Sequence, residues 1–336
     1  TISKSYFALT TAKIAGGAIF ITGNNVNVTD SVFEKCNVSL TATEPGKAYT
    51  TGGGSIYILG NNSYLSNCSF ERSNARQGGV IYVQGHNATL YGMKTDYTFA
   101  TRGGGAIYGA GSNSTISNSA FVRCNSTQTD GGSIYVDGIN AEILTSNFTM
   151  CYAQRNGGGI YISGFHATIE GSTFSLNNAT NSGGAIYVQG NLASIIDSNF
   201  LMSSAIKGDG GAIYVGGTNT TISGANSTMT QAVAGYGGII YVNGANTIIN
   251  NSVLSHSHSA KEGGAVYIKG DDSKIIDSNI SYTTSSYDGG AVYIDAKYAS
   301  IEDSHFAMNN ATNAGGAIYI NGISANVKNS TFNLTF

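Results

Sequence analysis

The chain has 336 residues, with 46 Gly, one Pro and no Trp, and charged side chains make up only 10% of it. Its net charge of −3 excludes the basic surface that nucleic-acid-binding proteins use. No apolar run reaches the length of a membrane span, whereas Tyr and the β-branched residues that suit strands are abundant. We therefore expect an all-β protein.

A short pattern, Gly-Gly-small-Ile-Tyr-Val-x-Gly, recurs twelve times along the chain. After a first gap of 37 residues, its aromatic position returns every 25 to 27 residues. A period this constant predicts a solenoid, in which each repeat packs only against its neighbours. The aromatic position falls at Phe20, Tyr57, Tyr82, Tyr108, Tyr135, Tyr161, Tyr187, Tyr214, Tyr241, Tyr267, Tyr293 and Tyr319.

Each repeat carries three strand signals in chain order. Ile or Val flanks the Tyr, as in Ile186 and Val188, so the aliphatic side chains share one face and the Tyr points to the other. An aliphatic residue eight positions after the Tyr marks a second strand, and usually a Phe thirteen positions after it marks a third. We predict a right-handed parallel β-helix over residues 1–336, a single domain of about 12 coils of about 26 residues with three short strands per coil.

The longer first gap predicts a loop insertion at residues 39–50, on one face of the solenoid. Both ends of the chain match half-repeats, so we expect a fragment of a longer protein. An open coil exposes unpaired backbone groups, which predicts association with copies of itself end to end.

The eleven tyrosines of the pattern form the first candidate site. Stacked repeats place them over one another on an outer face of the solenoid. One interpretation is that the stacked rings only stiffen the sheet. The alternative is a ligand-facing aromatic strip that binds sugars or extended peptides.

Asp277 and Asp303 occupy the same position in adjacent repeats. Such a pair suits Ca²⁺ binding or acid/base chemistry. The alternative is that both carboxylates accept backbone N–H groups at bends. No column of Lys or Arg accompanies the pair, so we assign no catalytic residue and expect neither a cofactor nor a metal beyond this weak calcium candidate.

Two kinds of covalent modification are suggested by the spacing of Cys and Asn. Cys124 and Cys151 share a position in adjacent repeats, which places their Cα atoms about 4.8 Å apart, within the range of a disulfide. Asn-x-Ser/Thr triplets are frequent and predict a glycosylated surface protein. Candidate acceptors are Asn27, Asn87, Asn113, Asn178, Asn219, Asn279 and Asn310.

A family resemblance follows from two longer motifs. Phe174-Ser-Leu-Asn177 precedes Gly183-Gly-Ala-Ile186, and Phe306-Ala-Met-Asn309 precedes Gly315-Gly-Ala-Ile318. This pairing resembles the repeats of chlamydial polymorphic outer membrane proteins. It is still more similar to the β-helix repeats of adhesin-like proteins of methanogenic archaea. The resemblance implies an extracellular, cell-surface, adhesive protein, and it supplies no catalytic residues.

Three hypotheses for the function follow. The first is a non-enzymatic cell-surface adhesin or stalk segment, a rigid rod that binds glycans or proteins of another cell. The second is a carbohydrate-active enzyme, either a polysaccharide lyase or a glycosidase. The third is a structural subunit of an extracellular fibre. Even coils with one modest insertion favour the first and the third, because β-helix enzymes usually carry long irregular loops over one face.

Overall fold

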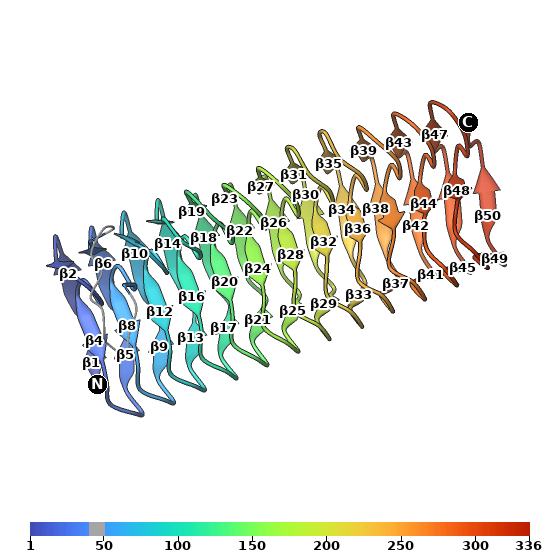
Figure 1. Ribbon diagram of the computed structural model, residues 1–336. Coiled ribbons are helices and arrows are strands. Elements are labelled where there is room, and N and C mark those ends of the chain that lie inside the picture. The colour runs from blue at the N-terminus through green and yellow to red at the C-terminus, as the bar shows by residue number, and fades with distance from the viewer. Residues whose placement is uncertain (40–50) are drawn as a thin grey trace. The chain divides into compact units, whose positions relative to one another are not determined.

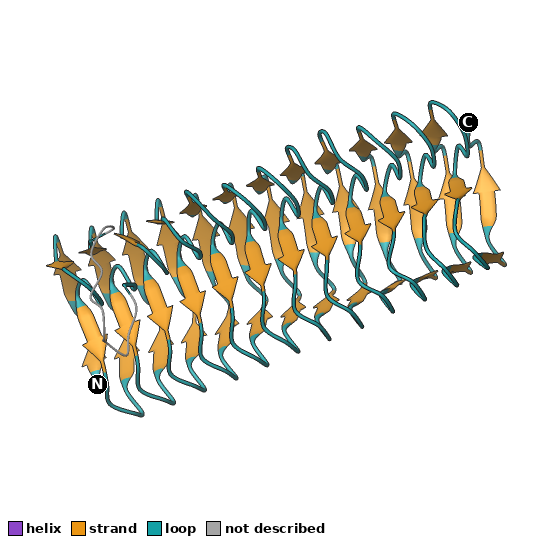
Figure 2. Ribbon diagram, in the orientation of Figure 1, coloured by secondary structure: helices purple, strands orange, loops and turns teal. Residues whose placement is uncertain are grey.

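The computed structural model describes residues 1–39 and 51–336, and in these ranges it contains strands, bends and turns but no helix (Figures 1 and 2). The chain forms a parallel β-solenoid of about twelve coils of about 26 residues, as predicted. Apart from Ser39, the predicted insertion at 39–50 lies outside the described residues. The chain divides into two compact units, unit 1 (Thr1–Ala167) and unit 2 (Thr168–Phe336).

A complete coil has four strand segments, one more than the sequence predicted, and the strands at equivalent positions build four parallel sheets in each unit. We number these sheets 1 to 4 in the order in which a coil passes through them. The extra segment, in sheet 3, is two residues long. Its sequence, such as Asn178–Ala179, lacks the aliphatic alternation that marks the other strands.

In unit 1, sheet 1 contains β1 (Ile2–Ser3), β5 (Asn27–Thr29), β9 (Tyr64–Ser66), β13 (Thr89–Tyr91), β17 (Thr115–Ser117) and β21 (Glu142–Leu144). Sheet 2 contains β2 (Tyr6–Ala8), β6 (Val32–Glu34), β10 (Ser69–Glu71), β14 (Lys94–Asp96), β18 (Ala120–Val122) and β22 (Asn147–Thr149). Sheet 3 contains β3 (Thr11–Ala12), β7 (Asn37–Val38), β11 (Asn74–Ala75), β15 (Phe99–Ala100), β19 (Asn125–Ser126) and β23 (Tyr152–Ala153). Sheet 4 contains β4 (Ile19–Ile21), β8 (Ile56–Ile58), β12 (Ile81–Val83), β16 (Ile107–Gly109), β20 (Ile134–Val136) and β24 (Ile160–Ile162).

In unit 2, sheet 1 contains β25 (Thr168–Glu170), β29 (Ser194–Ile196), β33 (Thr221–Ser223), β37 (Ile248–Asn250), β41 (Lys274–Ile276), β45 (Ser300–Glu302) and β49 (Asn326–Lys328). Sheet 2 contains β26 (Thr173–Ser175), β30 (Asn199–Leu201), β34 (Asn226–Thr228), β38 (Val253–Ser255), β42 (Asn279–Ser281), β46 (His305–Ala307) and β50 (Thr331–Asn333). Sheet 3 contains β27 (Asn178–Ala179), β31 (Ser204–Ala205), β35 (Gln231–Ala232), β39 (His258–Ser259), β43 (Thr284–Ser285) and β47 (Asn310–Ala311). Sheet 4 contains β28 (Ile186–Val188), β32 (Ile213–Val215), β36 (Ile240–Val242), β40 (Val266–Ile268), β44 (Val292–Ile294) and β48 (Ile318–Ile320).

Equivalent residues of neighbouring coils pair in register, so each repeat position becomes a column. In unit 2, for example, Ile186 pairs with Ile213 and Tyr187 with Tyr214. The predicted core positions are confirmed, because Ile186 and Val188 are fully buried and Phe200 is 1% exposed. Each such side chain contributes about 1.5–3 kcal/mol by leaving water.

The invariant Gly-Gly pair makes a bend that no other residue fits. Gly183 has a φ of 65°, in the left-handed region that suits glycine. A Cβ atom on Gly184 would lie 2.1 Å from the carbonyl oxygen of Gly211 in the next coil. The coils therefore stack closely only if both positions remain glycine.

Candidate functional site

The tyrosine column runs along the outer side of sheet 4 in both units. Neighbouring ring centroids are 4.7–5.1 Å apart in unit 1, from Phe20 to Tyr161, and 4.4–5.1 Å apart in unit 2, from Tyr187 to Tyr319. The rings lie face to face, so neighbouring rings cover each other's faces. A ligand approaching the column from outside would therefore contact ring edges and hydroxyl groups, not ring faces.

Burial restricts the column further. Tyr57, Tyr82, Tyr241 and Tyr267 are each less than 9% exposed, and the other tyrosines of the column are half-buried. The Tyr57 hydroxyl donates to Gln84 Oε1 at 2.6 Å, so part of the hydroxyl row is already used within the protein. The ligand-binding role of the column stays a prediction, and the stacking geometry agrees with the stiffening role.

The hydroxyl groups of Tyr108, Tyr214 and Tyr293 are protonated at neutral pH. Burial raises the pKa of Tyr293 to about 12, and the nearby Asp295 carboxylate adds to the effect. Burial also raises the pKa of Tyr108 and of Tyr214. These groups therefore act as neutral hydrogen-bond donors and acceptors and supply no charge.

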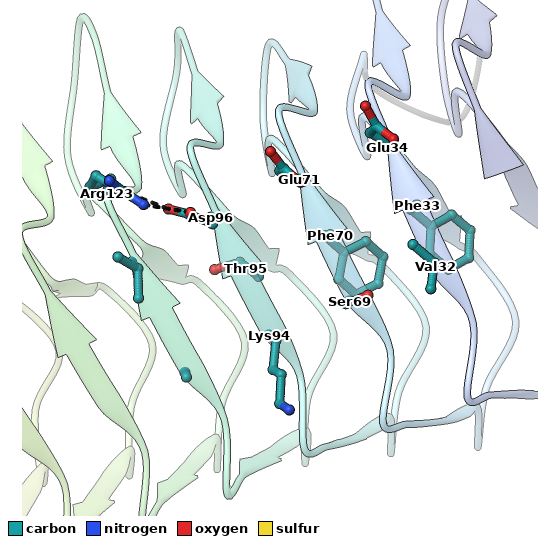
Figure 3. Close-up of a pocket in the computed structure, with 12 residues that line it drawn as sticks. Val32, Phe33, Glu34, Ser69, Phe70, Glu71, Lys94, Thr95, Asp96 and Arg123 are labelled. Carbon is teal, nitrogen blue, oxygen red and sulfur yellow. Dashed lines mark hydrogen bonds and ion pairs between the residues drawn. The ribbon is translucent and has the colours of Figure 1, made fainter. Parts of the chain in front are cut away.

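A groove of about 460 Å³ lies on the outer face of sheet 2 in unit 1 (Figure 3). It crosses strands β6, β10, β14 and β18, and its outward residues form two columns that flank the inward third-strand position. The first column consists of Val32, Ser69, Lys94 and Ala120. The second consists of Glu34, Glu71, Asp96 and Val122.

Three acidic residues thus lie side by side in successive coils, on strands whose backbones are about 4.8 Å apart by the usual spacing. A basic side chain from the following bend offsets the repulsion at two of them. Lys35 Nζ is 3.2 Å from Glu34 Oε1, and an Arg72 Nη2 is 3.2 Å from Glu71 Oε1. All four side chains are partly open to solvent, from 31% to 55% exposed, so these pairs orient the groups and add little stability.

Asp96 is held more firmly than the other two carboxylates. Arg123 donates to both of its oxygens, from Nε at 2.9 Å and from Nη2 at 2.6 Å. The guanidinium also lies 3.8 Å from the centre of the Tyr97 ring and donates to the Tyr97 hydroxyl at 2.8 Å. A bidentate pair of this kind fixes the carboxylate geometrically.

Glu34 and Lys94 give the groove two chemically different sides. The Tyr6 hydroxyl donates to Glu34 Oε2 at 2.7 Å and, with Lys35, holds the pKa of that carboxyl below its usual range. Lys94 extends away from the carboxylate row in Figure 3 and forms no ion pair with any residue that the structure describes. The groove therefore offers acceptors along one side and a cationic donor on the other.

Sequence reasoning missed this groove. The three carboxylates all lie fourteen positions after the aromatic residue of their repeat, and the insertion makes two of them 37 residues apart in the chain. The signal was available once each repeat was numbered from its aromatic residue. Thr95 marks the same place, because it replaces the Phe of the core column between Phe70 and Phe121.

The acidic candidates of the sequence analysis lie at bends. Asp277 and Asp303 occupy the bend between sheets 1 and 2 in adjacent coils, both in the left-handed conformation and both exposed. The described residues contain no group of three His, Cys, Asp or Glu side chains that is suited to hold a metal ion. Elsewhere, half-buried bend carboxyls such as Asp209 accept a backbone N–H, here from Tyr236 at 3.0 Å. That is the structural role we had considered for such residues.

Cys124 and Cys151 are buried free thiols, so the disulfide that their spacing allowed is not formed in this structure. In-register stacking keeps equivalent Cβ atoms about 4.8 Å apart, whereas a disulfide needs about 3.8 Å. The Ser133 hydroxyl donates to Cys151 Sγ at 2.8 Å. Burial raises the pKa of Cys151, which therefore stays a thiol.

The candidate glycosylation sites differ in their surroundings. Asn87 Nδ2 donates to Asn62 Oδ1 at 2.9 Å, and Asn113 Nδ2 donates to Asn87 Oδ1 at 3.1 Å, within a ladder of stacked Asn side chains. A glycan on either nitrogen would replace a hydrogen of that amide. Asn27, Asn219, Asn279 and Asn310 are exposed, and Asn178 is half-buried. Glycosylation of these residues stays a prediction.

Comparison with known proteins places the fold within the parallel β-solenoids. Residues 171–189 match the Chlamydia polymorphic membrane protein repeat. No curated protein matches the chain in sequence. A mutant tailspike protein of E. coli bacteriophage HK620, in complex with a pentasaccharide, is similar in structure with a TM-score of 0.57 and 11% identity, over 97% of this chain and 72% of the tailspike chain. A second mutant of that tailspike, in complex with a hexasaccharide, gives a TM-score of 0.53 and 13% identity, over 98% of this chain and 58% of the other.

At such identities the likeness shows the fold alone. The described residues contain no helix that is long and apolar enough to span a membrane.

Proposed function

We propose that the chain belongs to an extracellular, cell-surface protein that binds without catalysis, as an adhesin or stalk segment. In this proposal, the groove of unit 1 binds an oligosaccharide on the surface of another cell. The observation that carries it is the row formed by Glu34, Glu71 and Asp96 beside the mixed column of Val32, Ser69, Lys94 and Ala120. Support comes from the match to a membrane protein repeat and from the tailspike neighbours, which are complexed with oligosaccharides.

The chemistry of the groove suits a sugar chain. Carboxylates and Arg form directional, charge-assisted hydrogen bonds with hydroxyl groups. The apolar side chains of Val32, Ala120 and Val122 suit the C–H faces of pyranose rings. Because an extended pyranose chain advances by a length close to the spacing of the coils, successive sugars would meet successive members of the carboxylate row.

A glycosidase is the second candidate function, and one observation favours it. The strands that carry neighbouring acidic residues are about 4.8 Å apart, a spacing that allows carboxyl groups to reach the roughly 5–5.5 Å separation of retaining glycosidases. Such an enzyme also needs a carboxyl group with a raised pKa as the acid. The pKa of Glu34 is lowered instead, and Asp96 is occupied by Arg123. Binding is therefore the better-supported function.

The test is a glycan array followed by calorimetry on the best ligand, with mass spectrometry of the ligand after incubation. Glu71→Gln should weaken binding by about tenfold or more, because a charge-assisted hydrogen bond is lost. Glu142→Gln, which removes an exposed carboxylate from β21 in sheet 1, is the matched control and should bind normally. Equal effects of both variants on glycan binding, or the absence of any glycan ligand on the array, would refute the proposal that the groove binds an oligosaccharide. Ligand cleavage that Glu71→Gln abolishes would establish the glycosidase.

A further inference from the structure

One face of unit 2 carries no Asp, Glu, Lys or Arg, and its only titratable side chains besides Tyr are His256, His258 and His305. It is formed by the outer sides of sheet 2 and sheet 3 and by the bend between them, and we call it the corner face. Its residues are 173–180, 199–206, 226–233, 253–260, 279–286, 305–312 and 331–336. Unit 2 contains 11 Asp and Glu and 6 Lys, and all of them lie outside these ranges.

The fold itself does not exclude charge from these positions. In unit 1 the equivalent strands and bends carry Glu34, Lys35, Glu71, Arg72 and Asp96. The difference between the units therefore lies in the selected side chains, not in the backbone. A solvated face has no physical need to avoid charge, whereas the core of a protein interface is depleted of charged residues.

The bend of the corner face is exposed and, apart from His256, carries apolar or aromatic residues. The column of residues at this bend includes Leu176, Met202, Met229, Tyr282 and Met308, which are 39–53% exposed and have φ values of 50–57°. Apolar L-residues disfavour this left-handed conformation. Besides the Gly-Gly bend, each coil of unit 2 has two other left-handed bends, one between sheets 4 and 1 and one between sheets 1 and 2. These bends mostly use Asn, Asp or Gly, which tolerate the left-handed conformation.

The apolar residues at this bend are therefore locally unfavourable, whereas the other left-handed bends of the same unit mostly carry residues that suit the conformation. Exposed aliphatic residues continue the apolar surface on both sides of the bend, with Leu201 and Val253 on sheet 2 and Ile206 and Val233 just beyond sheet 3. Met and aromatic residues are enriched at protein interfaces. Such a contiguous exposed patch marks a contact site for another macromolecule.

We propose that the corner face of unit 2, with Asn178, Asn279 and Asn310 unglycosylated, binds the corner face of a second copy of this chain. The charge distribution favours a copy over other partners, because unit 2 has a net charge of −5 and its other faces hold all of that charge. Two copies therefore meet without like-charge repulsion only through this face. Six coils of about 4.8 Å, with about eight residues of 3.3 Å in each, give roughly 700 Å² per copy, close to the roughly 800 Å² per partner of a stable interface.

Sedimentation equilibrium of the full chain over a wide concentration range tests this proposal, which does not depend on the glycan site. The native chain should form dimers in the micromolar range. Met229→Glu should raise the dissociation constant by about 100-fold or more, because each copy would bury an unpaired carboxylate. Circular dichroism should show that the variant remains folded, since Met229 is 53% exposed.

Ile248→Glu is the matched control. It replaces an apolar residue that is 37% exposed on β37 in sheet 1, away from the corner face, and adds the same charge. This variant should dimerise like the native chain. A native chain that is monomeric at all concentrations would overturn the proposal. The corner face would then have to bind a different partner. Equal loss of dimer in both variants would overturn it as well.

Discussion

Exchanging side chains between two left-handed bends of unit 2 should change stability in opposite directions. Met229 and Asn246 lie at different bends, yet both have a φ of 55°. The backbone conformation is thus matched, and only the side chain differs. Met229→Asn should stabilise the chain, and Asn246→Met should destabilise it.

The magnitude follows from strain and burial. The left-handed conformation costs an L-residue roughly 1–2 kcal/mol, and Asn recovers much of this cost through local hydrogen bonds. Met229 is 53% exposed, so truncating it to Asn gives up about 0.7–1.4 kcal/mol of the roughly 1.5–3 kcal/mol that full burial of Met would contribute. The net stabilisation should be about 0.5 kcal/mol. Asn246→Met should cost about 1 kcal/mol.

Urea unfolding of the native chain and both variants provides the measurement. It is best performed at low protein concentration, where self-association does not add to stability. A loss of about 1 kcal/mol or more in Met229→Asn would contradict the reasoning. That result would mean that contacts along the bend column hold neighbouring coils together. The exposed apolar residues would then serve stability within the chain, and they would no longer indicate an interface at the corner face.

Three further outcomes follow from the packing and from the tyrosine column. Ile186→Asp buries an unpaired carboxylate and should cost about 3–5 kcal/mol, seen as a lower unfolding midpoint. Gly184→Ala should lower the midpoint of thermal unfolding, because the added Cβ would collide with the Gly211 carbonyl oxygen of the next coil. Gly109→Ala should leave that midpoint unchanged, because the nearest atom to its Cβ, the Tyr135 carbonyl oxygen, would be 3.8 Å away. The raised pKa of Tyr293 implies stability that is complete below pH 10 and lost as the pH rises through about 12, which absorbance and circular dichroism titrations can follow.

The solenoid could be predicted because its physical requirements recur in every coil. The Gly-Gly bend, the inward aliphatics and the inward Phe each have one acceptable class of side chain, so the sequence repeats wherever the backbone does. The extra strand in sheet 3 escaped prediction for the opposite reason. Its inward residue is small, as in Ala179 and Ala205, and its outward residue varies, so no alternation distinguishes it from a loop.

The candidate sites were harder to predict because they depend on register across coils. The sequence placed the tyrosines in one column, but it did not show that ring faces cover one another or that Tyr57 is fully buried. Glu34, Glu71 and Asp96 occupy equivalent positions only when the repeats are aligned with a gap for the insertion in the first one. The corner face is defined by the absence of Asp, Glu, Lys and Arg. This absence becomes apparent only when all coils of unit 2 are superposed.

Equivalent strands of the two units therefore present opposite chemistry on the same scaffold, and this difference allows their roles to be separated. A charge removed at Glu71 alters the polar groove of unit 1, whereas a charge introduced at Met229 alters the apolar bend of unit 2. Glu71 is half-buried on the outer face of its strand and Met229 is exposed, so neither change disturbs the buried columns that hold the coils. Glu71→Gln should weaken glycan binding and leave the dimer intact, and Met229→Glu should do the reverse, as calorimetry and sedimentation of both variants would show. Loss of both properties in either variant would mean that glycan binding and self-association use one coupled surface.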